Sequence, residues 1–417
     1  MSAVQKYCRQ IQNFGKRMRG RFVMKKTAII NGTIYPVEGD KIQGGTILWN
    51  EEGIIEYVGE AIALPENIHV IDAREYSLFP GFIDAHTHLG IQESGIGDMG
   101  NDLCEKGNGT VTPGMRAIDG IAFHDSAFED ALSAGVTTVM VAPGSDNVIS
   151  GTTAVVKTAG SPVKERIVKE NAGLKAAMGE MPKQAGAAAG QMPTSRLGIM
   201  YLLRKSLKEA QSYLAKKEQK TLTGDGNDED PDLEVLGKVL RREIPLRIHA
   251  MKSEDIYGAL RLAEEFHILI TLEHGFEADE FIEEILKAQI PVMYGTVFNW
   301  KYSYESKNAG FHRAAKLIRK GVRVSMITDH GCTPVQYLNL CAAMLLREGI
   351  SWEKALETIT INPAVSLGID HKVGSLKEGK EADILMFRGD PLSILGQPEK
   401  VFIKGRLVYK KTSPSDN

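Results

Sequence analysis

Short apolar runs separated by glycine, asparagine and aspartate dominate both ends of the chain. Near the start they are TAIING, TIYPV, GGTILWN, GIIEYVG and HVIDA, within residues 26–78. Near the end they are ADILMF, KVFIKG and RLVYKK, within residues 382–411. Apolar runs of this length, bounded by turn residues, are typical of β-strands. The pattern therefore predicts β-structure at both ends of the chain.

Between these ends, strand-like runs alternate with helix-like segments. The runs TTVMVAP (137–143), IPLRIHA (244–250) and IPVMYG (290–295) are separated by segments such as Ser253–Phe266 and 278–288. Such alternation predicts a parallel sheet whose strands are joined by helical crossovers. Three further helices are predicted. The first begins with the capping-box pattern SAFE (126–129) and ends near Ala134, the second covers about 196–217, and the third begins at Ser351 and ends at Asn362-Pro363. Strand-like pieces are predicted over 151–160 and 172–180.

Composition is that of a folded globular chain, with 43% hydrophobic and 25% charged residues. The 417 residues leave room for a smaller domain beside a barrel of about 250 residues. The net charge of −3 argues against nucleic acid or an anionic membrane as a partner. The cysteines Cys8, Cys104, Cys332 and Cys341 have no disulfide-framework spacing, so we expect reduced thiols and a cytoplasmic location.

Two polar segments stand apart from this pattern. Residues 1–23 carry basic side chains and no acidic one, which predicts either an organelle-targeting peptide or a dispensable extension. The dispensable extension is favoured because the predicted strand-rich segment can begin at Met24 without residues 1–23. Residues 217–232, KEQKTLTGDGNDEDPD, predict a flexible acidic surface insertion. Calcium binding there is disfavoured because the spacing of an EF-hand loop is absent.

Two histidines close the apolar run LFPGFIDAHTHLG, residues 78–90. Pro80 and Gly81 break the chain before a short strand-like piece, and His86 and His88 lie near its end. Side chains two residues apart on a strand point to the same face, so both imidazoles aim at one point. Two converging imidazoles form half of a site for Zn²⁺ or a similar divalent ion.

Three later strand ends carry further ligand-type residues. His249 lies near the end of IPLRIHA, His274 comes one residue before the final glycine of LITLEHG (269–275), and Asp329 follows the run VRVSMIT. In a parallel barrel the carboxyl ends of all strands meet at one rim, where the active site belongs. We therefore expect these three side chains beside His86 and His88.

The sequence Asp-x-His-x-His at the end of a strand entered through Pro-Gly, followed by His, His and Asp on later strand ends, resembles the amidohydrolase superfamily. Its imidazolonepropionase-related subgroup is the nearest match. The resemblance implies an α/β fold, a (β/α)8 TIM-like barrel over residues 81–365, with a small composite β-sandwich domain built from residues 24–80 and 366–411. The resemblance also implies one or two divalent ions, with Zn²⁺ favoured. His86 and His88 would bind the more buried ion, and His249 and His274 would bind a second ion or partly the first. Asp329 would contact a metal ion and act as general base.

The fourth-strand ligand is the ambiguous position. Members of the superfamily use a carboxylated lysine or a glutamate there, and the candidates are Lys157 and Glu180. We favour Glu180, which is expected to end a strand, and Lys157 then becomes a substrate-binding residue or a surface charge. His330, directly after Asp329, is a second predicted substrate-binding residue.

Strand alternation makes one more structural prediction. Asp84 shares the parity of His86, and Arg247 shares that of His249, so both should point into the barrel below the metal ligands. An unpaired charge there would cost several kcal/mol, so each should be hydrogen-bonded.

By the resemblance, the chain is a hydrolase of a C–N bond, an amide or cyclic amide, in a small molecule. One alternative is deamination of a heterocycle with the same ligands. The other is a non-catalytic assembly protein, like hydantoinase relatives that have lost the metal site, and it is disfavoured because every ligand histidine is kept. We expect a small-molecule substrate, no nucleic-acid or membrane partner, and a homo-oligomer.

Overall fold

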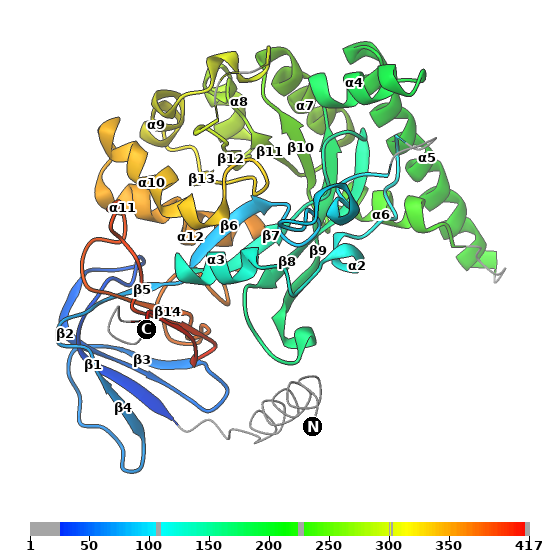
Figure 1. Ribbon diagram of the computed structural model, residues 1–417. Helices are drawn as coiled ribbons and strands as arrows, with labels where there is room; N and C mark the ends of the chain where they lie inside the picture. Colours follow the sequence, from blue (N-terminus) through cyan, green and yellow to red (C-terminus); the bar gives the residue numbers. More distant parts are fainter. Residues whose placement is uncertain (1–25, 106–109, 224–228, 300, 302, 413–417) are drawn as a thin grey trace, which may run out of the picture.

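Two eight-stranded sheets organise the protein (Figure 1). The structure is a computed structural model that describes residues 26–105, 110–223, 229–299, 301 and 303–412, so the predicted basic extension 1–23 lies outside the described residues. Within the described ranges, no helix has the length and apolar character needed to cross a membrane.

The smaller sheet combines both ends of the chain. Its strand order is β16-β15-β14-β5-β1-β2-β3, with β4 paired to β1. The join is the antiparallel pair β14 and β5, in which Leu385 lies opposite Phe79. Buried Trp49, Ile384 and Phe402 contribute to the core of this sheet. The strands are β1 (Thr27–Ile34), β2 (Ile42–Trp49), β3 (Ile55–Gly59), β4 (His69–Asp72), β5 (Ser77–Pro80), β14 (Ile384–Phe387), β15 (Lys400–Ile403) and β16 (Arg406–Lys410).

The larger sheet curls into a nearly closed barrel with the order β13-β12-β11-β10-β9-β8-β7-β6. The segment after β13 returns to β6, where the Asp329 N–H donates to the His86 carbonyl at 3.1 Å. The predicted α/β barrel with a second sheet from both chain ends is therefore confirmed. The strands are β6 (Phe82–Thr87), β7 (Val136–Val141), β8 (Ile149–Lys157), β9 (Ile167–Ala177), β10 (Leu246–Ala250), β11 (Ile270–His274), β12 (Val292–Tyr294) and β13 (Val324–Met326).

One barrel strand departs from the parallel arrangement. Strand β8 is antiparallel to both β7 and β9, with Lys157 opposite Thr138 and Ile149 opposite Ala176. The connection 142–148 is too short for a parallel crossover, which needs a dozen or more residues. Lys157 therefore lies at the start of β7, away from the barrel end that carries His86 and His88.

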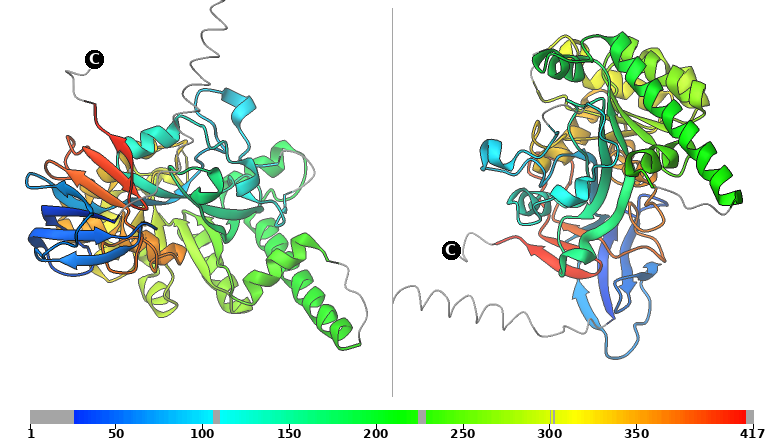
Figure 2. Two further views of the ribbon diagram at one scale, coloured as in Figure 1. Left: turned by 90° about the horizontal axis from the view of Figure 1, so that it is seen from below. Right: turned by 90° about the vertical axis from the view of Figure 1, so that its right-hand side faces the viewer.

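Helices cover the outside of the barrel, and the small sheet lies at one end of the molecule (Figure 2).

Three predicted boundaries are wrong. Helix α5 continues through residues 217–223 of the predicted flexible insertion. Glu180 begins α4 instead of ending a strand. Pro363 lies in the first turn of α12, where the N–H that proline lacks would have no partner within the helix. The helices are α2 (Ala117–Gly120), α3 (Ala127–Ser133), α4 (Glu180–Ala188), α5 (Arg196–Thr223), α6 (Pro231–Leu240), α7 (Ser253–Phe266), α8 (Ile282–Lys287), α9 (Phe311–Arg319), α10 (Leu338–Arg347), α11 (Trp352–Glu357) and α12 (Ile361–Leu367).

The chain crosses between the two sheets at Gly81. Strand β5 ends at Pro80 in the small sheet and β6 begins at Phe82 in the barrel. A Cβ atom on Gly81 would lie 2.0 Å from Thr137 Oγ1, so only glycine allows this close crossing. The Pro-Gly break read from the sequence is thus the point where the barrel begins.

Candidate metal centre

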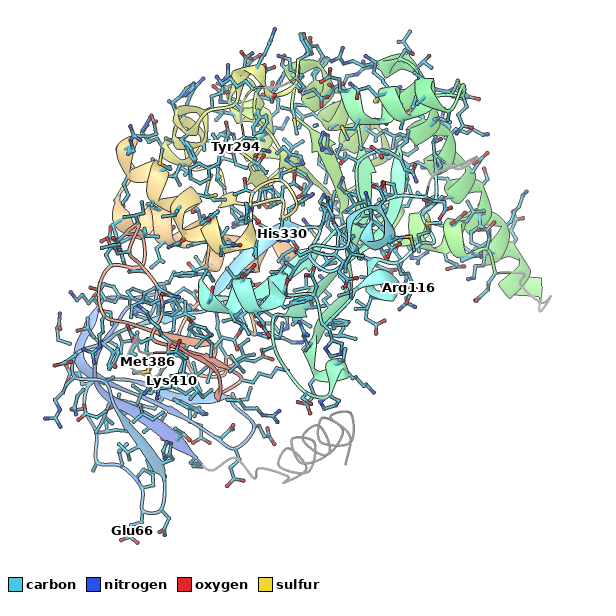
Figure 3. All side chains as sticks on the ribbon, viewed as in Figure 1. Glu66, Arg116, Tyr294, His330, Met386 and Lys410 are labelled. Atoms are coloured by element: carbon cyan, nitrogen blue, oxygen red, sulfur yellow. The ribbon has the colours of Figure 1, made fainter. Side chains whose placement is uncertain are left out.

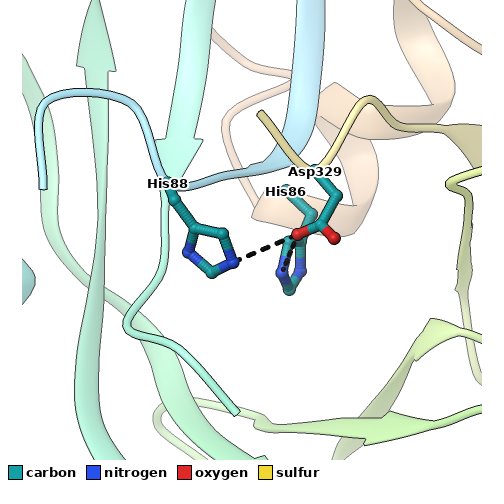
Figure 4. A group of neighbouring side chains, drawn as sticks. All are labelled: His86, His88 and Asp329. Carbon is teal, nitrogen blue, oxygen red and sulfur yellow. Dashed lines mark ion pairs between the residues drawn. The ribbon is translucent and has the colours of Figure 1, made fainter. Parts of the chain in front are cut away.

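Three buried side chains converge at one end of the barrel (Figure 4). His86 is the last residue but one of β6, His88 directly follows that strand, and Asp329 lies in the segment after β13. Asp329 Oδ1 is 3.1 Å from His88 Nε2 and 3.5 Å from His86 Nε2. The three ligand atoms all lie within 4.8 Å of one another, as a common metal ligand set requires.

Hydrogen bonds fix which nitrogen of each imidazole faces the site. His86 Nδ1 is 2.6 Å from Glu273 Oε2, His88 Nδ1 is 2.7 Å from the Ala142 carbonyl, and His274 Nδ1 is 2.6 Å from the Gly295 carbonyl. A carboxylate or carbonyl oxygen can only accept, so each Nδ1 carries the proton. Each ring therefore turns its Nε2 atom toward the site, and a histidine with its proton on Nδ1 binds metal through the Nε2 lone pair.

The remaining contacts test whether a cation fits. The Nε2 lone pairs of His86 and His88 face Asp329 Oδ1, and two acceptors at such distances repel each other. His86 Nε2 and Asp329 Oδ1 are also buried with no hydrogen-bond partner among the described residues. Buried polar atoms are rarely left unpaired, and a divalent cation between these three residues would satisfy them, so the residues present fit a metal ion.

His249 and His274 lie beside this group. The ring centroids of His274 and His86 are 5.2 Å apart, and those of His249 and His274 are 4.5 Å apart. Burial lowers the pKa of both His249 and His274 to about 3, so both rings are neutral at pH 7. His249 Nε2 is a further buried atom without a hydrogen-bond partner in the described part of the chain. All four predicted histidines thus come together.

Two of these residues hold a strained backbone conformation. His274 has φ of 73° and Asp329 has φ of 51°, in the left-handed region that side chains other than glycine seldom adopt. Such residues cost about 1–3 kcal/mol each and cluster at functional sites.

A buried acid–base network supports His86. Glu273 accepts from His86 Nδ1 with one oxygen, and its other oxygen accepts from Arg247 at 2.9 Å and Thr271 at 2.5 Å. Burial opposes ionisation, but Arg247 and His86 outweigh it and lower the pKa of Glu273 to about 2. A carboxylate anion behind the imidazole orients the ring and strengthens it as a ligand.

Asp84 and Arg247 point inward and are hydrogen-bonded, as alternation predicts. Asp84 Oδ2 accepts from Thr328 Oγ1 at 2.5 Å, and Arg247 binds Glu273. Burial raises the pKa of Asp84 to about 7. Asp84 Oδ1 also accepts from the backbone N–H of His86 at 3.2 Å. The hydrogen-bond networks of Asp84 and of Glu273 therefore both end on His86.

Glu273→Gln should weaken metal binding by about 10- to 100-fold, since it removes the anion behind His86. The measurement is a competitive metal titration with a chelating dye, with circular dichroism to verify folding. The control is Glu283→Gln, an exposed carboxylate on α8. Unchanged affinity in folded Glu273→Gln protein would contradict this role.

The structure does not bring Lys157 to the metal ligands. Its Nζ is fully buried at 2.7 Å from Asp383 Oδ2 and 2.7 Å from Glu381 Oε2, beside strand β14 of the small sheet. The prediction that Lys157 binds substrate is corrected on this geometry, because the antiparallel direction of β8 carries its end away from the site.

Glu180 lies near the barrel end but outside the three-residue group. Its backbone N–H donates to Glu305 Oε1 at 2.6 Å, and its Oε2 accepts from the Glu305 N–H at 3.4 Å. A metal-bridging role for Glu180 has no support in this placement.

Sequence reasoning missed Lys175, on β9. Its side chain is fully buried, and its Nζ donates to Ser145 Oγ at 2.6 Å, while that hydroxyl lies 3.1 Å from His249 Nδ1. Burial lowers the pKa of Lys175. No sequence pattern indicates this placement, because Lys175 comes opposite inward-facing Arg247 only through the register of β9 on β10. The missed Glu305 lies in a loop, where no periodicity points to it.

His330 follows Asp329 in the segment after β13, and Figure 3 labels it beside the barrel strands, away from Met386 and Lys410 of the small sheet. Its Nδ1 accepts from the Val335 N–H at 3.1 Å, and burial lowers the pKa of the ring. The neutral ring therefore carries its proton on Nε2. Substrate binding by His330 stays a prediction.

Comparisons with known proteins agree with this geometry. A model of the Amidohydrolase family matches residues 77–408. A crystal structure of an amidohydrolase from Thermotoga maritima MSB8 is 36% identical, covers 93% of this chain and 100% of that chain, and has a TM-score of 0.89.

Two curated relatives are similar along most of this chain. Imidazolonepropionase of Alkaliphilus metalliredigens is 25% identical over 428 residues, which cover 93% of each protein. Amidohydrolase tasK of Hapsidospora irregularis is 26% identical over 86% of this chain, but the chain spans only 39% of that relative's length.

Proposed function

Since this chain belongs to the amidohydrolase family, we propose that it is a metal-dependent hydrolase of a C–N bond, an amide or cyclic amide, in a small molecule. The observation that carries the proposal is the set of Nε2 lone pairs facing Asp329 Oδ1 in a buried site. Residues His86, His88 and Asp329 would hold a divalent ion, with His249 and His274 beside it. Zn²⁺ is proposed because neutral imidazoles dominate the donor set.

A divalent ion at this site would supply Lewis acidity toward the scissile carbonyl and make a water molecule easier to deprotonate. The protein's own part is proton transfer. Asp329 Oδ1 lies against His86 and His88, and a divalent ion held between these residues would keep the Asp329 carboxylate ionised. Asp329 is thus an anion at neutral pH, ready to take a proton from water and deliver it to the leaving nitrogen.

We further propose Lys175 as the fourth-strand residue, in place of Glu180 and Lys157. Its amine is buried behind His249 with Ser145 as its hydrogen-bond partner, and its lowered pKa favours the uncharged form. An uncharged lysine amine can add to carbon dioxide, forming an N–C bond with loss of a proton. The resulting carbamate offers two oxygens, as the carboxylated lysine of family members does.

Lys175→Ala should lose a metal ion, whereas Glu180→Gln should keep the wild-type metal content. The measurement is metal quantitation on protein purified with added bicarbonate. Lys169→Ala is the matched control, because Lys169 lies on the same strand but donates to the Leu367 carbonyl instead. Full metal content in Lys175→Ala, or loss in Glu180→Gln, would reverse the assignment.

Metal quantitation followed by turnover of a substrate panel tests the function as a whole. The panel contains N-acyl amino acids, dipeptides, cyclic ureides and aminated heterocycles. Ammonia release from the heterocycles alone would favour the deaminase alternative. Metal-free, inactive protein would favour a non-catalytic assembly protein.

The partners and the location of the protein are also proposals. The net charge of −3 favours a small-molecule substrate over nucleic acid. A cytoplasmic homo-oligomer stays a prediction, which sedimentation and localisation of the intact chain can test.

A further inference from the structure

A second buried carboxylate, Glu305, faces His249. It lies in the loop between β12 and α9, and the residue is 3% exposed. Its Oε2 is 3.7 Å from His249 Nε2, and its Oε1 accepts the Glu180 N–H at 2.6 Å. One oxygen is therefore anchored to backbone, while the other is turned toward the site.

The loop holds this carboxylate in place before any ligand arrives. The hydroxyl of Ser303 accepts from the Glu305 N–H and from the Ser306 N–H, both at 3.2 Å. Asn308 Nδ2 donates to Glu277 Oε1 at 2.6 Å and ties the loop to the barrel. A recognition group that is already ordered loses little entropy when a ligand binds.

The chain also makes room for Glu305 at Gly179. This glycine has φ of +92°, and a Cβ atom there would lie 1.8 Å from Glu305 Oε1. Any other residue would displace the carboxylate. Gly179 is thus required both by its backbone conformation and by the close approach of Glu305.

Glu305 has no lysine or arginine partner among the described residues. The neighbouring Arg196 is committed to Asp255, with contacts of 2.8 and 3.2 Å. No described hydrogen bond ends on Glu305 Oε2. A buried carboxylate usually has a cationic partner, so a missing cation is expected to come from the ligand.

A metal ion is the first candidate for that cation, but the geometry disfavours it. The ligand atoms of His86, His88 and Asp329 lie within 4.8 Å of one another, and Glu305 is outside this group, so an ion held by these three residues does not bind Glu305. An ion beside His249 that used Glu305 would be lost from Glu305→Gln. A cationic group of the substrate needs only one free carboxylate oxygen, which Glu305 Oε2 provides.

We propose that Glu305 selects substrates that carry a cationic nitrogen, an ammonium, amidinium or guanidinium group, next to the scissile bond. The inference rests on the proposed function for the scissile bond, but the recognition is a property of this loop alone. Glu305 binds and orients, and Asp329 transfers the proton.

The test uses benzamidine and benzamide, which share one ring and differ in the charge of the attached group. Their affinities are measured by calorimetry on the metal-loaded protein. Benzamidine should bind wild type about 10- to 100-fold more tightly, the range expected for a hydrogen bond to a charged group. In Glu305→Gln the preference should fall to near one, while the metal content stays unchanged. Glu254→Gln, an exposed carboxylate on nearby α7, should keep the wild-type preference.

Three outcomes would overturn the proposal. These are no benzamidine preference in wild type, a preference that survives Glu305→Gln, and loss of metal in Glu305→Gln, which would make Glu305 a ligand. If Glu305→Gln does not fold, Glu305→Asp keeps the charge but withdraws the oxygen, and it should weaken the preference. Failure of the proposed function is visible separately, as inactivity on the substrate panel with benzamidine recognition intact.

Discussion

Replacing Asp329 by asparagine should leave most of the bound metal in place and lower kcat by about 10²- to 10⁴-fold, the usual worth of general acid–base assistance. Asparagine keeps the shape of the side chain and can offer an oxygen to the metal, but its amide does not accept a proton at neutral pH. The loss should therefore appear in kcat and in kcat/KM alike, with little change in KM.

The measurement pairs metal quantitation with steady-state kinetics on any substrate found in the panel. Asp119→Asn, an exposed aspartate on α2, is the control for a change of charge alone. Near wild-type turnover by Asp329→Asn would show that Asp329 is not the base. His330, or the metal-activated water without a protein base, would then have to account for the proton transfer.

Replacing Lys157 by methionine should lower the free energy of unfolding by about 3–5 kcal/mol, the range for removing one partner of a buried ion pair. Asp383 and Glu381 would lose the buried cation that they share between the barrel and the small sheet. Burial lowers the pKa of Lys157, but these two carboxylates outweigh it and raise it above its usual value, so the lysine is charged at pH 7.

Urea unfolding at a fixed metal concentration measures this change, since bound metal itself adds stability. Lys404→Ala is the matched control, because Lys404 also faces Glu381, at 3.5 Å, but is partly exposed. Its loss should cost no more than about 1 kcal/mol. Unchanged stability together with a raised KM in Lys157→Met would instead support the substrate-binding role that the structure argues against.

Local patterns were enough to predict much of this protein. Strand periodicity and turn residues located the strands of both sheets, since both depend on neighbours within a few residues. The parity of His86 and His88 at the end of β6, and the positions of His249, His274 and Asp329 near later strand ends, identified side chains that do meet. The same parity placed Asp84 and Arg247 inside the barrel.

Contacts between distant segments were decided only by the tertiary structure. The direction of β8 removed Lys157 from the site, and the register of β9 against β10 brought Lys175 in. Glu273 orients His86 across 187 residues of sequence, and Glu305 reaches His249 from a loop. A strand's alternation tells which face a side chain takes, but pairing, strand direction and loop path depend on free energy summed over the whole chain. No local pattern of residues contains that sum.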